Sequence, residues 1–181
     1  MRNATSLKLF LFVCAALLLA VEAGAQAPAP AMPLALVPPA LLKAKTVFIS
    51  NAGADSGLFP HPFSGDPDRA YNEFYEGIQS WGRYQLVSDP SEADVVFELR
   101  LMAPNGPSNP NKQNGASDPL PMFRLVIFDR KTHYVLWALT ESITMALLQK
   151  THDNNFDLAL TALTLDLKRL ANAPASAAGN R

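Results

Sequence analysis

The sequence has one cysteine, Cys14, and only three histidines in 181 residues. A single cysteine cannot form an intramolecular disulfide or a cysteine-ligated zinc site, so disulfide scaffolds and zinc fingers are excluded. An excess of positive charge is also missing, because 15 basic residues are balanced by 16 acidic ones. This balance disfavours nucleic-acid binding and polybasic attachment to a membrane surface.

Familiar catalytic and cofactor motifs are missing too. There is no G-x-S-x-G nucleophile elbow. The stretch 51–57 lacks the third glycine and the immediate helix start of a dinucleotide-binding turn. His61, His133 and His152 lie on separate predicted elements without the spacing of metal ligands. We therefore expect no cofactor and no metal, and we favour a protein that is not an enzyme.

The N-terminus has the features of an export signal. Two basic residues precede an apolar run over 9–21, which is short for a bilayer span. Small residues at 23–25 fit a signal peptidase site, so we expect residues 1–25 to be removed and the mature chain to begin at Gln26 or Ala27. An uncleaved N-terminal anchor is the alternative, and it would be the only membrane attachment. The expected location is periplasmic or secreted.

Composition divides the rest of the chain into a spacer, one domain and a tail. Residues 26–42 are rich in proline and alanine, which favours an extended spacer. Residues 43–170 are predicted to form a single α/β domain, and 171–181 a disordered tail. Within the domain, residues 103–121 contain five prolines, four asparagines and two glycines. This composition predicts a long polar, mobile loop.

The first half of the domain predicts a strand followed by a helix. Residues 46–49 are β-branched and aromatic, which is typical of a buried strand. Asp66-Pro67-Asp68 is predicted to cap and start a helix, and Gly82 to end it. The helix carries one continuous apolar stripe. Its members are Tyr71, Phe74, Tyr75, Ile78 and Trp81.

The second half predicts three strands and a second helix. A short strand over 84–87 is an additional expectation. Residues 95–101 alternate between apolar and polar faces, and 123–128 and 134–139 form a hairpin around a turn at 129–132. Asp153 or Asn154 is predicted to cap a helix that reaches Leu170. The order β-α-β-β-β-α predicts a two-layer α+β sandwich, with a mixed sheet and both helices on one face.

Two surfaces are candidate binding sites. On the hairpin, Val126 and Phe128 share the open sheet face, and Tyr134 and Leu136 add apolar surface for a protein partner or a second copy. The alternative is that the proline-rich segment or residues 143–150 cover this face. In the loop after the first strand, three aromatic side chains could contact a ligand or fold back onto the core. They are Phe59, His61 and Phe63.

Several motifs resemble small exported domains of the bacterial envelope. Residues 74–87 end a helix in a G-R-Y-Q-L-V turn, and Ala93-Asp94-Val95 starts the next strand. Asp129-Arg130-Lys131-Thr132 with Val135-Leu136-Trp137 forms a D-x-x-T-x-x-V-L-W hairpin. The pattern resembles the N-terminal domain of the translocation protein TolB and the domain of curli-secretion lipoproteins. The resemblance implies a periplasmic assembly role and no catalytic residue. The lipoproteins' lipidation cysteine is missing here.

Three functions follow from these features. The first is a non-enzymatic binding or assembly domain of the bacterial cell envelope, whose partner is an envelope protein or another copy of the chain. The second is a small hydrolase or metal-dependent enzyme that uses His61, Asp66 and Asp68 in the loop 51–68 together with the polar loop near residue 110. The third is a carrier that binds a small molecule with the aromatic residues of the same loop.

Overall fold

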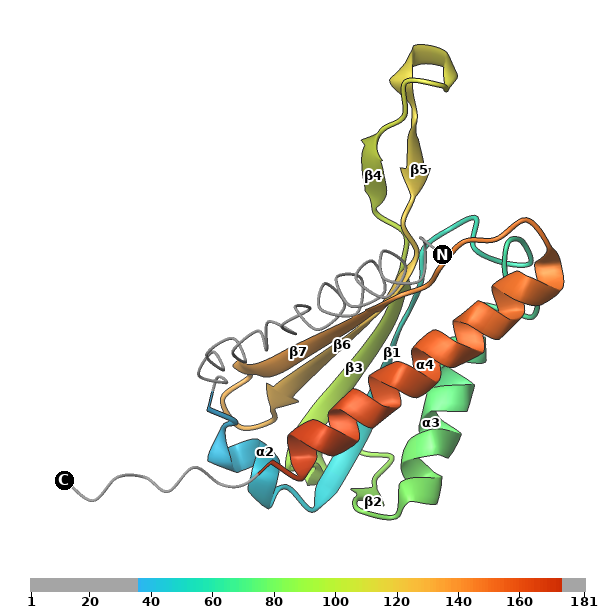
Figure 1. The fold of residues 1–181 in the computed structure, drawn as a ribbon. Coiled ribbons are helices and arrows are strands. Elements are labelled where there is room, and N and C mark those ends of the chain that lie inside the picture. Colours follow the sequence, from blue (N-terminus) through green and yellow to red (C-terminus); the bar gives the residue numbers. More distant parts are fainter. Residues whose placement is uncertain (1–35, 174–181) are drawn as a thin grey trace, which may run out of the picture. The chain divides into compact units, whose positions relative to one another are not determined.

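The fold was analysed in a computed structural model that describes residues 36–173 (Figure 1). The predicted signal peptide, its cleavage site, most of the predicted spacer and the end of the predicted tail lie outside these residues. None of the helices within 36–173 is both long enough and apolar enough to cross a membrane.

A five-stranded mixed sheet forms one layer of the domain, in the order β2-β1-β3-β6-β7. The central strand β3 pairs in parallel with β1 and antiparallel with β6, and β7 continues antiparallel as one edge. The other edge is the two-residue strand β2, which pairs in parallel with β1. The strand bounds are β1 Thr46–Ala54, β2 Gln85–Leu86, β3 Val95–Met102, β6 Met122–Asp129 and β7 Val135–Ser142.

Two helices cover one face of this sheet and form the second layer (Figure 1). They are α3 (Arg69–Trp81) and α4 (Gln149–Ala171), and a short helix α2 (Pro39–Lys43) precedes β1. The core lies between the layers, where alternate residues of β3 and β6 meet the apolar stripes of the helices. Its fully buried side chains include Phe74, Ile78, Phe97, Leu99, Phe123, Leu125, Phe156 and Leu163. The predicted two-layer α+β sandwich is confirmed.

The predicted end of α3 is confirmed and its predicted start is wrong. Gly82 adopts φ +67°, the left-handed conformation that a helix C-cap requires. The helix begins at Arg69 rather than at Pro67. The reason is a separate turn before the helix, in which the carboxylate of Asp66 accepts a hydrogen bond from the Asp68 N–H at 2.8 Å.

The predicted start of α4 is also wrong, because the helix begins at Gln149. Asp153 therefore lies in the second turn, where its carboxylate bonds to another loop rather than to the helix terminus. A 3₁₀ turn, η1 (Pro90–Glu92), precedes β3, and the Asp89 carboxylate caps it by accepting from Ser91 N–H.

Residues 103–121 contain a projecting two-stranded ribbon in place of the predicted mobile loop (Figure 1). We call β4 (Asn105–Ser108), β5 (Ser117–Pro119) and their connection the arm; the connection includes the 3₁₀ turn η2 (Gln113–Gly115). Polar side chains replace an apolar core here. The Ser108 hydroxyl donates to Gly115 O at 2.6 Å, and Asn109 Nδ2 donates to the Asp118 carboxylate at 2.9 Å.

Candidate binding surface

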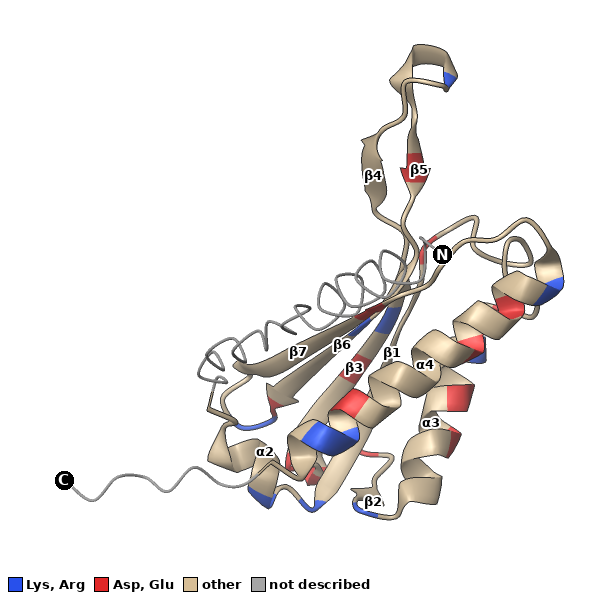
Figure 2. Cartoon of the chain, viewed as in Figure 1, with Lys and Arg blue, Asp and Glu red and all other residues tan. Residues whose placement is uncertain are grey.

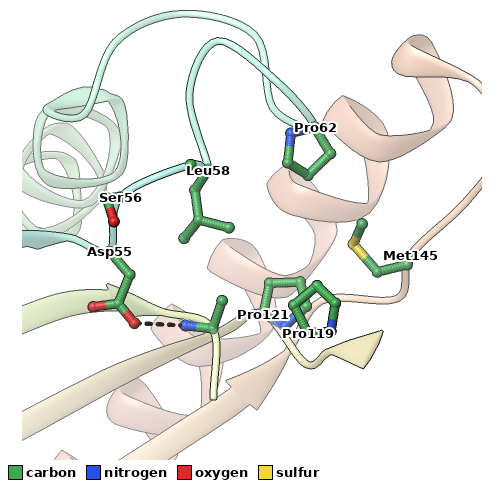
Figure 3. Close-up of a pocket in the computed structure, with 9 residues that line it drawn as sticks. Asp55, Ser56, Leu58, Pro62, Pro119, Pro121 and Met145 are labelled. Atoms are coloured by element: carbon green, nitrogen blue, oxygen red, sulfur yellow. Dashed lines mark hydrogen bonds between the residues drawn. The ribbon is translucent and has the colours of Figure 1, made fainter. Parts of the chain in front are cut away.

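A groove of about 500 Å³ lies where β1 ends and the base of the arm meets the segment after β7. Figure 3 shows Asp55 and Ser56 on one side of it and prolines with Met145 on the other. Most of the lining is apolar and comes from segments far apart in the sequence. These side chains are Leu58, Pro62, Pro119, Pro121 and Met145. The groove is suited to apolar groups.

Asp55 is the acidic residue in this groove, and its carboxylate is already hydrogen-bonded within the fold. Its carboxylate accepts from the Ala103 N–H at 2.9 Å and from Arg100 Nη2 at 2.9 Å. The hydrogen bond from Ala103, followed by that from Arg100, lowers the pKa of Asp55. The carboxylate thus joins the loop after β1 to the end of β3, where the arm begins. Its geometry is that of a support rather than of a general acid or base.

Exposed apolar side chains gather beside the groove. A second hollow of about 520 Å³ shares Pro119, Pro121 and Met145 with the groove. Two of the nine exposed large hydrophobic side chains of residues 36–173 line these hollows, Leu120 and Met145, and two more, Leu147 and Leu148, follow Met145 closely in the chain. We call these four the apolar rim: Leu120 (47% exposed), Met145 (40%), Leu147 (100%) and Leu148 (69%). Several exposed apolar side chains close to an apolar groove are typical of protein-binding surfaces.

A polar cluster connects the loop after β1 to α4. Asp153 accepts hydrogen bonds from the Ser64 N–H at 2.8 Å, from the Ser64 hydroxyl at 2.7 Å and from Arg69 Nη1 at 3.0 Å. Burial opposes ionisation, but these hydrogen bonds outweigh it and lower the pKa of Asp153 to about 2. Arg69 also contacts the carboxylates of Glu73 and Asp157. Its guanidinium lies 4.3 Å from the centre of the Phe156 ring.

The segment 143–149, which carries three of the four rim residues, is held at both ends. At its start, Ile143 is buried and its N–H donates to Pro121 O at 2.8 Å. At its end, Gln149 Nε2 donates to Pro62 O at 2.6 Å, and its Oε1 lies 3.0 Å from His61 Nδ1. Between them, Asn155 Nδ2 donates to Thr144 O at 2.7 Å. Met145, Leu147 and Leu148 are therefore exposed on a well-anchored backbone.

The three residues predicted as a ligand loop have different environments. Phe63 is fully buried, with its ring centre 5.2 Å from that of Phe156. Phe59 is partly buried, and its ring centre lies 6.2 Å from that of Phe63. His61 is exposed and contacts Gln149. The two phenylalanines thus extend the core beneath the loop, which is the fold-back alternative.

The four predicted partner-binding residues do not form one exposed surface. Val126 and Phe128 lie on the sheet face opposite the helices. Val126 is buried, with 5% of its surface exposed, and Phe128 is partly buried. Leu136 packs partly against the core. Tyr134 is 74% exposed in the turn before β7. The residues after Ser142 continue from the end of the sheet to α4.

The loop residues considered for an enzyme are bonded to separate partners. Asp66 accepts from Asp68 N–H, Asp68 accepts from Asn51 Nδ2 at 2.8 Å, and His61 contacts Gln149. Within residues 36–173, no hydrogen bond or ion pair joins these three side chains to one another. In the same residues, no group of three histidine, cysteine or acidic side chains is arranged to hold a metal ion.

The sequence analysis missed the apolar rim and the role of Asp153. One signal for the rim was available, since residues 145–148 form an apolar run between a strand and a helix without the periodicity of either. No local signal could identify Asp153 as the partner of Ser64 and Arg69, because 89 and 84 positions separate them in the chain.

Comparison with known proteins identifies similar folds and no family. No protein-family model and no curated protein matches the sequence. A PelC dodecamer from Paraburkholderia phytofirmans is similar with a TM-score of 0.43 and 14% identity, over 72% of this chain and 89% of that chain. The LpoB C-terminal domain from Salmonella enterica has a TM-score of 0.35 and 10% identity, over 56% of this chain and 83% of that chain. An uncharacterized lipoprotein B from Nitrosomonas europaea has a TM-score of 0.33 and 12% identity, over 71% of this chain and 81% of that chain. These values assign the chain to none of the three families.

Proposed function

We propose that this chain is an exported, non-enzymatic binding domain of the bacterial cell envelope, located in the periplasm or secreted. The observation that carries the proposal is the apolar rim beside the groove at the base of the arm. The N-terminal sequence, with its basic start, apolar run and small residues at 23–25, supports export. The resemblance to TolB N-terminal domains and curli-secretion lipoproteins is a hypothesis that belongs to this proposal.

The partner is a protein segment with apolar side chains. The rim itself contains no charged residue, and the nearby acid Asp55 is already paired with Arg100 and Ala103. An apolar segment seated in the groove would contact the base of the arm and the segment after β7 together. Burial of one leucine side chain contributes about 1.5–3 kcal/mol, which corresponds to roughly 10- to 150-fold in affinity.

Site-specific photo-crosslinking in cells tests this function. A photoreactive residue is placed at Leu147 in the rim, and a matched one at Leu158, which is 60% exposed on α4. We expect one specific envelope protein to be crosslinked from Leu147 and not from Leu158. With that protein purified, Leu148→Asp should weaken binding at least about tenfold, whereas Leu158→Asp should not. Equal crosslinking from both positions, or no effect of Leu148→Asp on the affinity, would contradict the proposal.

A further inference from the structure

The segment between β7 and α4 leaves much of its main chain without hydrogen-bond partners. Ile143 N–H donates to Pro121 O, but the N–H groups of residues 144–148 donate to no group within residues 36–173. In the same part of the chain, the carbonyl groups of residues 145–147 accept no hydrogen bond. Unpaired donors and acceptors in a row are the groups to which another strand bonds.

The backbone of this segment is compatible with strand pairing. No residue of 143–148 has a positive φ, and Leu148 is extended at φ −109° and ψ 138°. The stretch contains no proline and no charged residue, which are the usual features that block pairing. The bulge of β7 lies around Leu136, at the opposite end of that strand, so it leaves residues 143–148 uninterrupted.

The side chains of the segment would meet those of a paired strand in an alternating pattern. An extended chain directs successive side chains to opposite sides, so Met145 and Leu147 share one side. Met145 lines both hollows. Side chains of paired strands lie beside one another at matching positions. A strand bonded here would therefore bury an apolar side chain at every second residue.

Charge restricts the kind of segment that fits. Figure 2 shows the connection from β7 to α4 without charge until Lys150, and Pro119 and Pro121 beside it are also uncharged. Lys150 is exposed and pairs with no carboxylate within residues 36–173. An uncharged segment that ends in an acidic residue complements this pattern. A proline-rich segment does not, because proline has no N–H to donate.

We propose that the partner binds to residues 144–148 as an extended β-strand, through main-chain hydrogen bonds, with alternate apolar side chains against the rim. Binding by strand addition takes its affinity from the main chain and its specificity from alternate side chains. The inference rests on the proposed function, since it concerns the same surface. It adds the conformation of the partner segment and its sequence pattern, which is an alternation of apolar and polar residues without proline and with an acidic end.

A library of random peptides tests the sequence pattern. The peptides have about ten residues, the upper length of a typical strand, and are selected on the purified natural chain after removal of those that bind Leu148→Asp. We expect the enriched peptides to alternate apolar and polar residues and to lack proline. Leu158→Asp, a matched change on an exposed residue of α4, is the control and should bind them as the natural chain does. Circular dichroism establishes that both variants are folded.

N-methylation of the best peptide tests the main-chain hydrogen bonds. Only alternate N–H groups of a strand face its neighbour, so two copies are made, methylated at the odd or at the even residues. One copy should lose affinity at least about fivefold, and the other should stay within about twofold of the unmodified peptide. In NMR hydrogen exchange, the bound peptide should slow the exchange of alternate amides within residues 144–148.

The other outcomes overturn the proposal. Enriched peptides with an apolar residue at every third or fourth position would indicate a helix, and proline-rich peptides a polyproline segment. Equal effects of the two methylation patterns, or no protected amide within residues 144–148, would exclude strand addition. In these cases the proposed function still stands, because an apolar segment binds the rim. If no peptide prefers the natural chain to Leu148→Asp, the proposed function fails and this inference fails with it.

Discussion

Replacement of Asp153 by asparagine should remove the electrostatic part of the polar cluster while keeping the size of the side chain. The lowering of the pKa of Asp153 from its ordinary value of 3.8 to about 2 corresponds to roughly 2–3 kcal/mol of preference for the ionised form. The side chain is 23% exposed, so solvent screening reduces the expected contribution to about 1–2 kcal/mol. We therefore expect Asp153→Asn to lower the free energy of unfolding by about 1–2 kcal/mol at neutral pH.

The pH dependence of this difference is the decisive measurement. A carboxyl whose pKa is lower in the folded state stabilises the fold above its unfolded pKa, and the contribution disappears as the pH falls through the folded value. Urea unfolding of both proteins should therefore give curves that differ at pH 7 and converge between about pH 4 and about pH 2. The control is Asp157→Asn, since Asp157 contacts only Arg69 and is 56% exposed. A difference for Asp153→Asn that does not change with pH would refute the reasoning.

Three further predictions concern the core, a helix end and an acidic pair. Phe63→Ala should lower the free energy of unfolding by about 3–5 kcal/mol in denaturant titrations, because it empties a fully buried site. Gly82→Ala should cost about 1 kcal/mol in the same assay through its positive φ alone, because no atom lies within 4 Å of an added Cβ. Burial, followed by hydrogen bonding and the charge of Asp166, raises the pKa of Glu141, so its ionised form destabilises the fold above that pKa. Glu141→Gln should raise the melting temperature at pH 7 and have little effect in acid.

The elements that the sequence predicts best are those in which local pattern and tertiary packing agree. In β3, Phe97 and Leu99 are buried while Arg100 is exposed, as strict alternation predicts for a strand with one covered face. In α3 the apolar stripe coincides with the buried side, and the glycine at position 82 is where the chain turns left-handed. Each of these signals is contained within a few residues, so no knowledge of distant contacts is needed.

The arm and the start of α4 could not be predicted for two different physical reasons. Residues 103–121 have the composition of a loop, and their ribbon is held by side-chain contacts such as Lys112 with Asp118 rather than by an apolar face. The prediction for α4 identified acidic residues near a helix start and assigned them to capping. The carboxylate of Asp153 instead bonds to Ser64 and Arg69, a pairing that only the folded chain reveals.

The candidate surface depends on this same long-range pairing. A leucine that is fully exposed, as Leu147 is, offers a partner little if its backbone must also be ordered on binding, because ordering costs conformational entropy. Here Ile143 and Gln149 fix the two ends of the segment, and Asp153 holds the loop to which Gln149 bonds. The polar contacts of Asp153 and Gln149 therefore hold the backbone segment on which Met145, Leu147 and Leu148 lie. This is why a loss of stability in the Asp153 cluster and a loss of affinity at the rim are expected to be linked.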